Sequence, residues 1–326
     1  MMILLASCEL QPDLPICDYS IQLEYWLSES AQKNELHQYV KAIDEYIFDE
    51  YGILFQINRV ESRAYNKNFV SEVDLPAGKY SVVSWANVSA SSKAVGVEVG
   101  KTHINDLMLN LNNPVNTTYN IHEHSERLYQ GYRTFSVREH GVSQVRVYMS
   151  HAHCILEVIV KWTNNTPPDT ENFYMTLRDV KDTYAFTPAY KVFGNTINGF
   201  EYAEEQHLIT DKERRYYLTV PNVGSRDISH VQQAKMDITR NVSGRFSCYR
   251  LSNNTHPLFR LYAGDTPLMR EIDLHKYFQN MGIELDTNLK QEFAIIIEIG
   301  ENDVIRVTPV VISDWNNGGE IGGGTF

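Results

Sequence analysis

The strongest constraint on the fold is an alternation of apolar and polar residues that recurs along the chain. The clearest case is residues 19–27, in which the odd positions are all apolar: Tyr19, Ile21, Leu23, Tyr25 and Leu27. Side chains two residues apart lie on one face of a strand, so this period predicts a half-buried β-strand.

Further short strands are predicted wherever β-branched and aromatic residues gather between turn residues. They cover residues 40–48, 53–57, 70–75, 80–86, 144–148, 154–162, 216–220, 245–251, 258–262, 293–299 and 304–312. The turn residues 49–52 and 300–303 predict two hairpins, and residues 144–148 and 154–162 are expected to pair with each other. A short helix is expected over 273–280, and a short helix or long loop within 90–120. Strands at this spacing without βαβ alternation predict an all-β fold built from sandwiches.

The first residues match a lipoprotein cleavage pattern. Leu4-Leu5-Ala6-Ser7 precedes Cys8, so an apolar run and two small residues lead to the thiol that would carry lipid. Residues 1–7 are short for a complete signal and contain no basic residue, so either the natural start lies upstream or the match is fortuitous. We interpret 1–7 as a partial signal, Cys8 as the lipidation site and the Pro-containing residues 8–16 as an extended tether.

Composition narrows the function. The chain has 326 residues, of which 43% are apolar, enough for two packed domains. The net charge is −12 and basic residues do not cluster, which argues against a nucleic-acid groove. No run approaches the roughly 20 apolar residues of a membrane helix. The four cysteines form no CxxC motif, and no disulfide is predicted.

Several groups of residues are of types that occur in metal-binding or catalytic sites. His122-Glu123-His124 and His151-Ala152-His153-Cys154 contain possible metal ligands, and His151 and His153 would share a strand face, but no third ligand is evident and no metal site is predicted. Cys154 beside a histidine suggests a nucleophile, although adjacent strand residues point to opposite faces. Glu204-Glu205 does not stand out as a glycosidase pair. The four tryptophans, Trp26, Trp85, Trp162 and Trp315, are expected in cores rather than on a sugar platform. We therefore expect no enzymatic activity.

The order of several motifs resembles the FimB-type fimbrial anchor family, the anchoring lipoproteins of type V pili in Bacteroidales-type bacteria. After the lipobox these are Cys17-x-Tyr19-x-Ile21, residues 46–54 (YIFDEYGIL), 75–80 (LPAGKY) with Trp85-Ala86, 127–131 (RLYQG), and 307–312 (VTPVVI) with Asp314-Trp315-Asn316. The resemblance spans nearly the whole chain.

The resemblance implies two tandem transthyretin-like β-sandwich domains with Greek-key-type connections. A new β register that begins near Phe135, after Gly131, places the domains at 17–134 and 135–326, the second with a Gly-rich tail. It implies an outer-membrane protein that faces outward, holds a fimbrial shaft and limits its length. Subunits would join by donor-strand exchange, a form of β-augmentation. We expect the first strand to stay in its own sheet, because cutting it away would release the lipid. The expected contact with the shaft is Val304, Ile305, Val307, Val310, Ile312 and Trp315, with a share for the tail at 313–326.

Two alternatives remain open. One is a fimbrial shaft or tip subunit, which would have to release its first strand. The other is a glycan-binding surface lipoprotein, which would bind polysaccharide without depending on fimbrillin. Apart from lipid on Cys8 we expect no cofactor, and we expect no nucleic-acid partner or small-molecule substrate.

Overall fold

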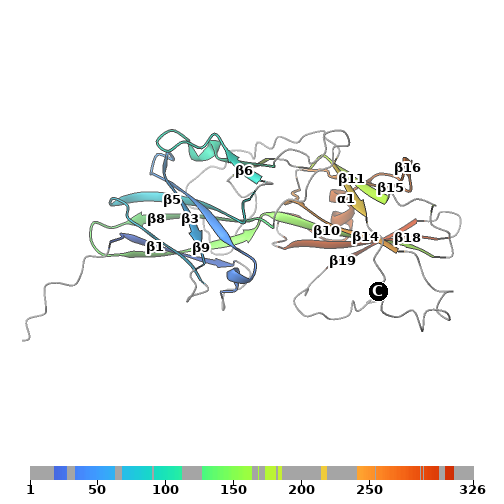
Figure 1. Cartoon of the computed structure of the whole chain (residues 1–326), viewed down its shortest axis with the longest axis horizontal. Helices are drawn as coiled ribbons and strands as arrows, with labels where there is room; N and C mark the ends of the chain where they lie inside the picture. Colours follow the sequence, from blue (N-terminus) through green and yellow to red (C-terminus); the bar gives the residue numbers. More distant parts are fainter. Residues whose placement is uncertain are drawn as a thin grey trace, which may run out of the picture.

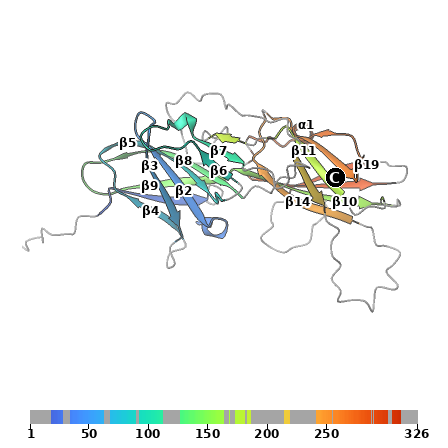
Figure 2. The same cartoon turned by 45° about the horizontal axis from the view of Figure 1, so that its top comes forward.

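The described residues form four β-sheets in an elongated molecule, whose earlier and later strands occupy opposite ends (Figures 1 and 2). The computed structural model describes residues 18–27, 34–62, 68–89, 92–111, 127–163, 168, 173–180, 183–185, 214–218, 241–253, 255–286, 288, 290–300 and 305–311. The prediction of an all-β fold is confirmed.

The largest sheet has seven strands in the order β3-β2-β5-β8-β9-β1-β4. Its strands are β1 (Ile21–Leu27), β2 (Ala42–Phe48), β3 (Leu54–Glu61), β4 (Phe69–Val73), β5 (Gly78–Ala86), β8 (Tyr129–Val137) and β9 (Ser143–His151). The alternation predicted for the first strand is confirmed, because Ile21, Leu23, Tyr25 and Leu27 are buried while the residues between them are half-buried. All four belong to an apolar core that also takes residues from every other strand of this sheet.

The β2–β3 hairpin follows the turn chemistry predicted for residues 49–52. The Asp49 Oδ1 atom accepts hydrogen bonds from the backbone N–H groups of Tyr51 and Ile53, both at 2.9 Å. Gly52 has a φ of 75°, the left-handed conformation that glycine adopts without strain. The predicted hairpin is therefore confirmed.

A small sheet covers the second face of β2 and β5. It has the order β12-β7-β6, with β6 (Ser92–Val95), β7 (Met108–Leu111) and β12 (Thr183–Ala185). A separate apolar cluster, which includes Phe48, Trp85 and Leu109, lies beneath it. The span 90–120, expected as a helix or loop, thus holds two strands and the short 3₁₀ helix η2 (Ile104–Asp106); a second 3₁₀ helix, η1 (Leu36–Gln38), precedes β2.

Two further sheets share one core at the other end of the molecule. The four-stranded sheet has the order β14-β10-β18-β19, and the five-stranded sheet contains β13, β11, β15 and β16, with β17 also paired to β15. Their bounds are β10 (His153–Trp162), β11 (Phe173–Arg178), β13 (Arg214–Leu218), β14 (Asn241–Tyr249), β15 (Leu258–Ala263), β16 (Thr266–Pro267), β17 (Ile272–Asp273), β18 (Gln291–Ile299) and β19 (Ile305–Val311). Residues from both sheets form this core, among them Val158, Met175 and Ile297.

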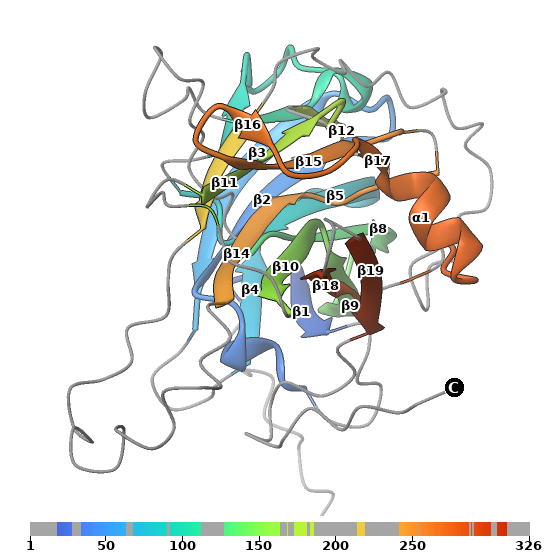
Figure 3. The same ribbon diagram turned by 90° about the vertical axis from the view of Figure 1, so that its right-hand side faces the viewer.

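One α-helix, α1 (Leu274–Asn280), closes an end of this core in the described chain (Figure 3). The Asp273 carboxylate caps it by accepting the N–H of Lys276 at 3.1 Å, and Leu274 and Phe278 bury the apolar face. The predicted helix is confirmed, as is the hairpin of β18 and β19. The described helices are all too short to cross a bilayer.

The chain passes between the two ends of the molecule at Ala152. This residue separates β9, in the seven-stranded sheet, from β10, in the four-stranded sheet. The prediction that these two strands pair is wrong: β9 pairs with β1 and β8, and β10 with β14 and β18. The expected boundary between residues 134 and 135 falls inside β8, which pairs with β5 over its whole length. The tandem-domain division itself stays a prediction.

Candidate functional site

The last described strand, β19, forms one edge of the four-stranded sheet. It pairs with β18 from Ile305 opposite Ile299 to Val311 opposite Phe293. In the described part of the chain no strand lies on its other side, so its outer backbone edge is open to a partner (Figure 3). Open edges of this kind are templates for strand addition.

The side chains of β19 hold it against its own sheet. Ile305 and Val307 are half-buried and pack against the apolar core, while Arg306 points outward, 4.0 Å from the Glu298 carboxylate. Pro309, opposite Ile295, has no N–H to donate, which suits an edge strand better than a central one. Available to a partner strand are therefore the backbone edge and outward side chains such as Arg306.

The predicted shaft-contact residues are only partly described. Ile305 and Val307 face the protein's own core, and Val310 lies in β19 opposite Ala294. Val304, Ile312, Trp315, the tail at 313–326 and the lipidation site Cys8 lie outside the described residues. The contact set stays a prediction.

The first described strand, β1, lies inside its sheet, whereas β19 lies at an edge. Over all seven residues β1 pairs in parallel with β9, and over five it pairs antiparallel with β4. It is thus an inner strand, and removing it would separate β4 from the rest of the sheet. The expectation that this strand stays in its own sheet agrees with this position.

A buried carboxylate ties β1 to its neighbours. The Tyr25 hydroxyl donates to Glu45 Oε1 at 2.7 Å and lies 3.0 Å from Ser84 Oγ. Glu45 Oε2 accepts from Asn58 at 3.0 Å and from Ser71 at 2.8 Å. Asn58 is on β3 and Ser71 on β4, so the two outermost strands of the sheet converge on one carboxylate oxygen.

Burial and hydrogen bonding act in opposite directions on the titration of this network. Burial raises the pKa of Glu45 above its ordinary value of 4.5, while the hydrogen bonds from Tyr25, Asn58 and Ser71 limit the rise. Burial, with the negative charge of Glu45, raises the pKa of Tyr25 well above its ordinary value. Sequence reasoning missed this network, although a signal existed: Glu45 shares its strand face with the apolar Ile43 and Ile47.

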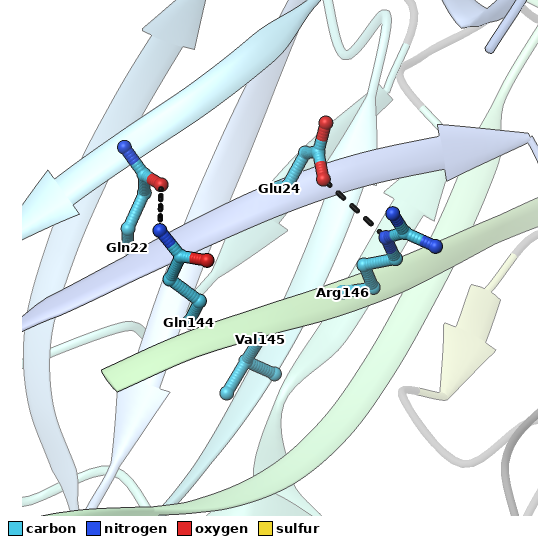
Figure 4. Close-up of a pocket in the computed structure, with 5 residues that line it drawn as sticks. All are labelled: Gln22, Glu24, Gln144, Val145 and Arg146. Atoms are coloured by element: carbon cyan, nitrogen blue, oxygen red, sulfur yellow. Dashed lines mark hydrogen bonds and ion pairs between the residues drawn. The ribbon is translucent and has the colours of Figure 1, made fainter. Parts of the chain in front are cut away.

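A polar groove lies on the outer face of β1 and β9, with a cavity volume of about 330 Å³ (Figure 4). Gln144 donates to Gln22 Oε1 at 3.2 Å, and Arg146 lies 3.4 Å from Glu24 Oε2. The Arg146 guanidinium also stacks 4.4 Å from the ring centre of Trp26. Amide, carboxylate and guanidinium groups beside an indole are groups that can bind sugar hydroxyls.

The tryptophans do not form one platform within the described residues. Trp85 and Trp162 are buried in separate cores, as expected, whereas Trp26 lies on the outer face of β1. Trp315 is outside the described residues.

Cys154 and Cys248 lie opposite each other on β10 and β14, both buried in the apolar core. The hydrogen bond with Cys248 and burial raise the pKa of the Cys154 thiol well above its ordinary value, which disfavours the nucleophilic thiolate. The ring of His153 contacts Tyr129 of a different apolar core, in line with the expectation that the two neighbours face opposite ways. His122, Glu123, His124, Glu204, Glu205 and Cys17 lie outside the described residues.

His151 and His153 flank Ala152 with ring centres 4.9 Å apart. Both are buried, and both rings contact the ring of Tyr129. Burial and the nearby His151 lower the pKa of His153 well below its ordinary value. The two histidines thus meet on one side, as their spacing predicted.

Comparisons with known proteins give a family and a set of similar folds. Residues 14–317 match the profile described as "Fimbrillin-A associated anchor proteins Mfa1 and Mfa2". The search of curated proteins finds no similar sequence. The fold is similar to that of the fimbrial anchor protein Mfa2 from Porphyromonas gingivalis, with 14% identity, a TM-score of 0.60, and coverage of 88% of this chain and 94% of that one.

Two structures from Bacteroides thetaiotaomicron VPI-5482 are similar as well. A candidate adhesin is 16% identical, with a TM-score of 0.64 and coverage of 90% of this chain and 97% of that one. A candidate polysaccharide-binding protein is 16% identical, with a TM-score of 0.62 and coverage of 88% and 95%. At these identities the likeness concerns the fold.

Proposed function

Since the chain belongs to the family of fimbrillin-A associated anchor proteins Mfa1 and Mfa2, we propose that it anchors a fimbrium to the outer membrane and limits its length. A fimbria-associated role follows from the family; the lipid anchor, the limit on length and the mode of joining are our inference. The role is structural rather than catalytic.

The observation that carries the proposal is the contrast between the first and last described strands. A polymerising subunit must free its first strand, but here β1 is an inner strand whose Tyr25 is hydrogen-bonded to the buried Glu45. At the other end β19 has an open edge. The chain is thus suited to accept a shaft subunit at β19 while its N-terminal segment stays fixed. This contrast favours an anchor over a shaft or tip subunit.

Attachment to the membrane is assigned to Cys8 from the sequence pattern. Lipid chains contribute about 0.8 kcal/mol for each buried CH₂ group, and stable anchoring takes more than one chain. The residues 8–16 would span at most about 30 Å between lipid and folded protein.

The experiment is Cys8→Ala in the native host, with lipid labelling and microscopy of the fimbriae. We expect the variant to lose the label and to shed fimbriae, often overlong, into the medium. If the label is lost while fimbriae stay attached at normal length, the protein is a surface lipoprotein of another kind.

The joining surface is tested separately by cross-linking. Arg306→Cys places a thiol on the open β19 edge, and Arg245→Cys places one on β14, the opposite edge of the same sheet. Both native side chains are exposed and the nearby Cys154 and Cys248 are buried. We expect the shaft subunit to cross-link to position 306 and not to 245. Cross-linking at 245 alone would move the joining surface to β14.

The polar groove supports a second candidate, polysaccharide binding. It places Gln22, Glu24, Gln144 and Arg146 on one face, and the fold is similar to that of a candidate polysaccharide-binding protein. The test is titration of surface polysaccharides against the wild type and Gln144→Ala. Two results together would favour this function over anchoring. The first is saturable polysaccharide binding that is weaker in Gln144→Ala, and the second is normal fimbriae in Cys8→Ala cells.

A further inference from the structure

Two imidazoles and a carboxylate meet where β9 passes into β10. His151 ends β9, His153 begins β10, and Glu292 is the second residue of β18. One ligand atom from each lies within 4.8 Å of the other two. The residues are 4%, 0% and 7% exposed, respectively, so this cluster is shielded from water.

The strand register explains why a residue so distant in sequence completes the group. In the parallel pairing of β10 and β18, Glu292 lies beside Ile155. His153 precedes Ile155 by two residues, so its side chain shares the face of Glu292. The neighbouring Cys154 belongs to the apolar core on the opposite face.

His153 has the geometry of a metal ligand. Its Nδ1 atom lies 2.7 Å from the Leu128 carbonyl oxygen, to which it can only donate, so in the neutral ring Nε2 carries the lone pair. Nε2 is buried and has no hydrogen-bond partner among the described residues. Metal-binding histidines typically hold their second nitrogen on a carbonyl in this way, whereas a buried polar atom without a partner is otherwise costly.

We propose that His151, His153 and Glu292 bind a divalent transition metal ion, with Zn²⁺ the best match to the ligand set. Two histidines and a glutamate form a known zinc combination, in which a water molecule can fill the fourth position. Ligand atoms on tetrahedral zinc are about 3.3 Å apart, given bonds of about 2.0–2.1 Å. From their separations of up to 4.8 Å, the three atoms therefore need to approach by about 1.5 Å at most.

The charges around the cluster indicate which ligand matters most. Lys290 lies 3.6 Å from Glu292, and the buried Arg250 donates to the His151 and Leu285 carbonyls at the same junction. Both cations oppose a metal ion, and Glu292 supplies the negative charge that offsets them. Glu292→Gln should therefore weaken binding more than loss of one imidazole.

The consequence is a fixed junction. A metal held by His151, His153 and Glu292 would connect the end of β9, the start of β10 and β18 at the point where the chain changes sheet. Binding to the folded form alone would stabilise it by mass action. This role does not depend on the proposed anchoring function.

The test is calorimetric titration of ZnCl₂ into the EDTA-treated full chain, with thermal unfolding in parallel. We expect one Zn²⁺ per chain and a Tm increase of about 5 °C at a hundredfold excess over Kd. Glu292→Gln and His153→Gln should each weaken binding by more than about tenfold and abolish the Tm increase.

The matched control uses a second group, exposed His256 with half-buried Asp273 and His275, which also brings its ligand atoms within 4.8 Å. The double variant His256→Gln/His275→Gln should bind Zn²⁺ like the wild type. Circular dichroism checks folding, and if His153→Gln does not fold, Glu292→Gln decides the matter. Absence of binding by the wild type, or binding lost only in the double variant, would overturn the proposal.

Discussion

The first and last described strands differ in how they are held. β1 has a neighbour on each side, buries four apolar side chains and is hydrogen-bonded through Tyr25 to a buried carboxylate. β19 has one neighbour in the described chain, and its Ile305 and Val307 are only half-buried. One strand lies inside its sheet, and the other forms an edge.

This difference shows that the backbone groups open to a partner are decided by the position of a strand in its sheet rather than by its sequence pattern. Both segments have a strand-like pattern in the sequence, but only an edge strand offers free backbone groups. The proposed attachment through the N-terminus would require a fixed β1, with the open edge elsewhere.

The largest expected effect is that of Leu23→Ala in β1. Leu23 is fully buried, so the cavity should cost about 3 kcal/mol in the free energy of unfolding, measured with urea. The control is Gln22→Ala, on the polar face of the same strand, which should change stability by less than about 0.5 kcal/mol. Hydrogen exchange should show faster opening of β1 and β4 in Leu23→Ala.

Tyr25→Phe should have the next largest effect. It removes the hydroxyl that donates to Glu45 and lies against Ser84, leaving a buried acceptor without this partner, at a cost of about 1.5 kcal/mol. Tyr262→Phe is the control, because that ring is half-buried and stacks on Tyr174. Equal losses in the two variants would show that the Glu45 network does not hold β1.

Val307→Ala in β19 should cost only about 1 kcal/mol, because the side chain is half-buried at an edge. Urea unfolding beside Leu23→Ala gives the direct comparison of the two strands. If the two substitutions were equally destabilising, β19 would be as fixed as β1, and the contrast on which the anchoring proposal depends would be lost.

The smallest expected effect is a pH dependence from Glu45. Its folded-state pKa is raised by burial, so its contribution to stability is fully present below about 4.5 and is lost as pH rises through the folded-state pKa. Stability of the wild type relative to Glu45→Gln should therefore fall as pH rises from 4.5. The measurement is the urea midpoint of both proteins at a series of pH values from 4.5 upward. If the stability of the wild type relative to Glu45→Gln rose with pH instead, the hydrogen bonds to the ionised carboxylate would outweigh the effect of burial.

Much of the fold could be predicted from the sequence, because local patterns report local structure. The alternation of residues 19–27, the turn at residues 49–52 and the short helix expected over 273–280 all correspond to elements of the structure. Partner strands could not be predicted in this way. β9 and β10 were expected to form a pair, but Ala152 provides no turn, and the chain continues into another sheet.

The candidate sites were less predictable, since they depend on contacts between distant residues. Sequence spacing brought His151 and His153 together, but Glu292 reaches them only through the β10–β18 register. Glu45 is of a residue type that is usually exposed, and its burial is known only from the structure. Exposed Arg306 and half-buried Val307 follow from the alternation of β19, whereas the open edge requires the sheet order.

The parallel pairing of β1 with β9 has a mechanical consequence. The tether proposed for residues 8–16 would pull β1 from its N-terminal end, while a load transmitted through β10 would pull β9 from its C-terminal end, by way of Ala152. Parallel strands pulled from opposite ends are loaded in shear, so their hydrogen bonds share the force instead of opening one after another. Tension along the molecule would thus load the β1–β9 pair in shear, the direction in which paired strands resist separation better than when they are peeled apart from one end.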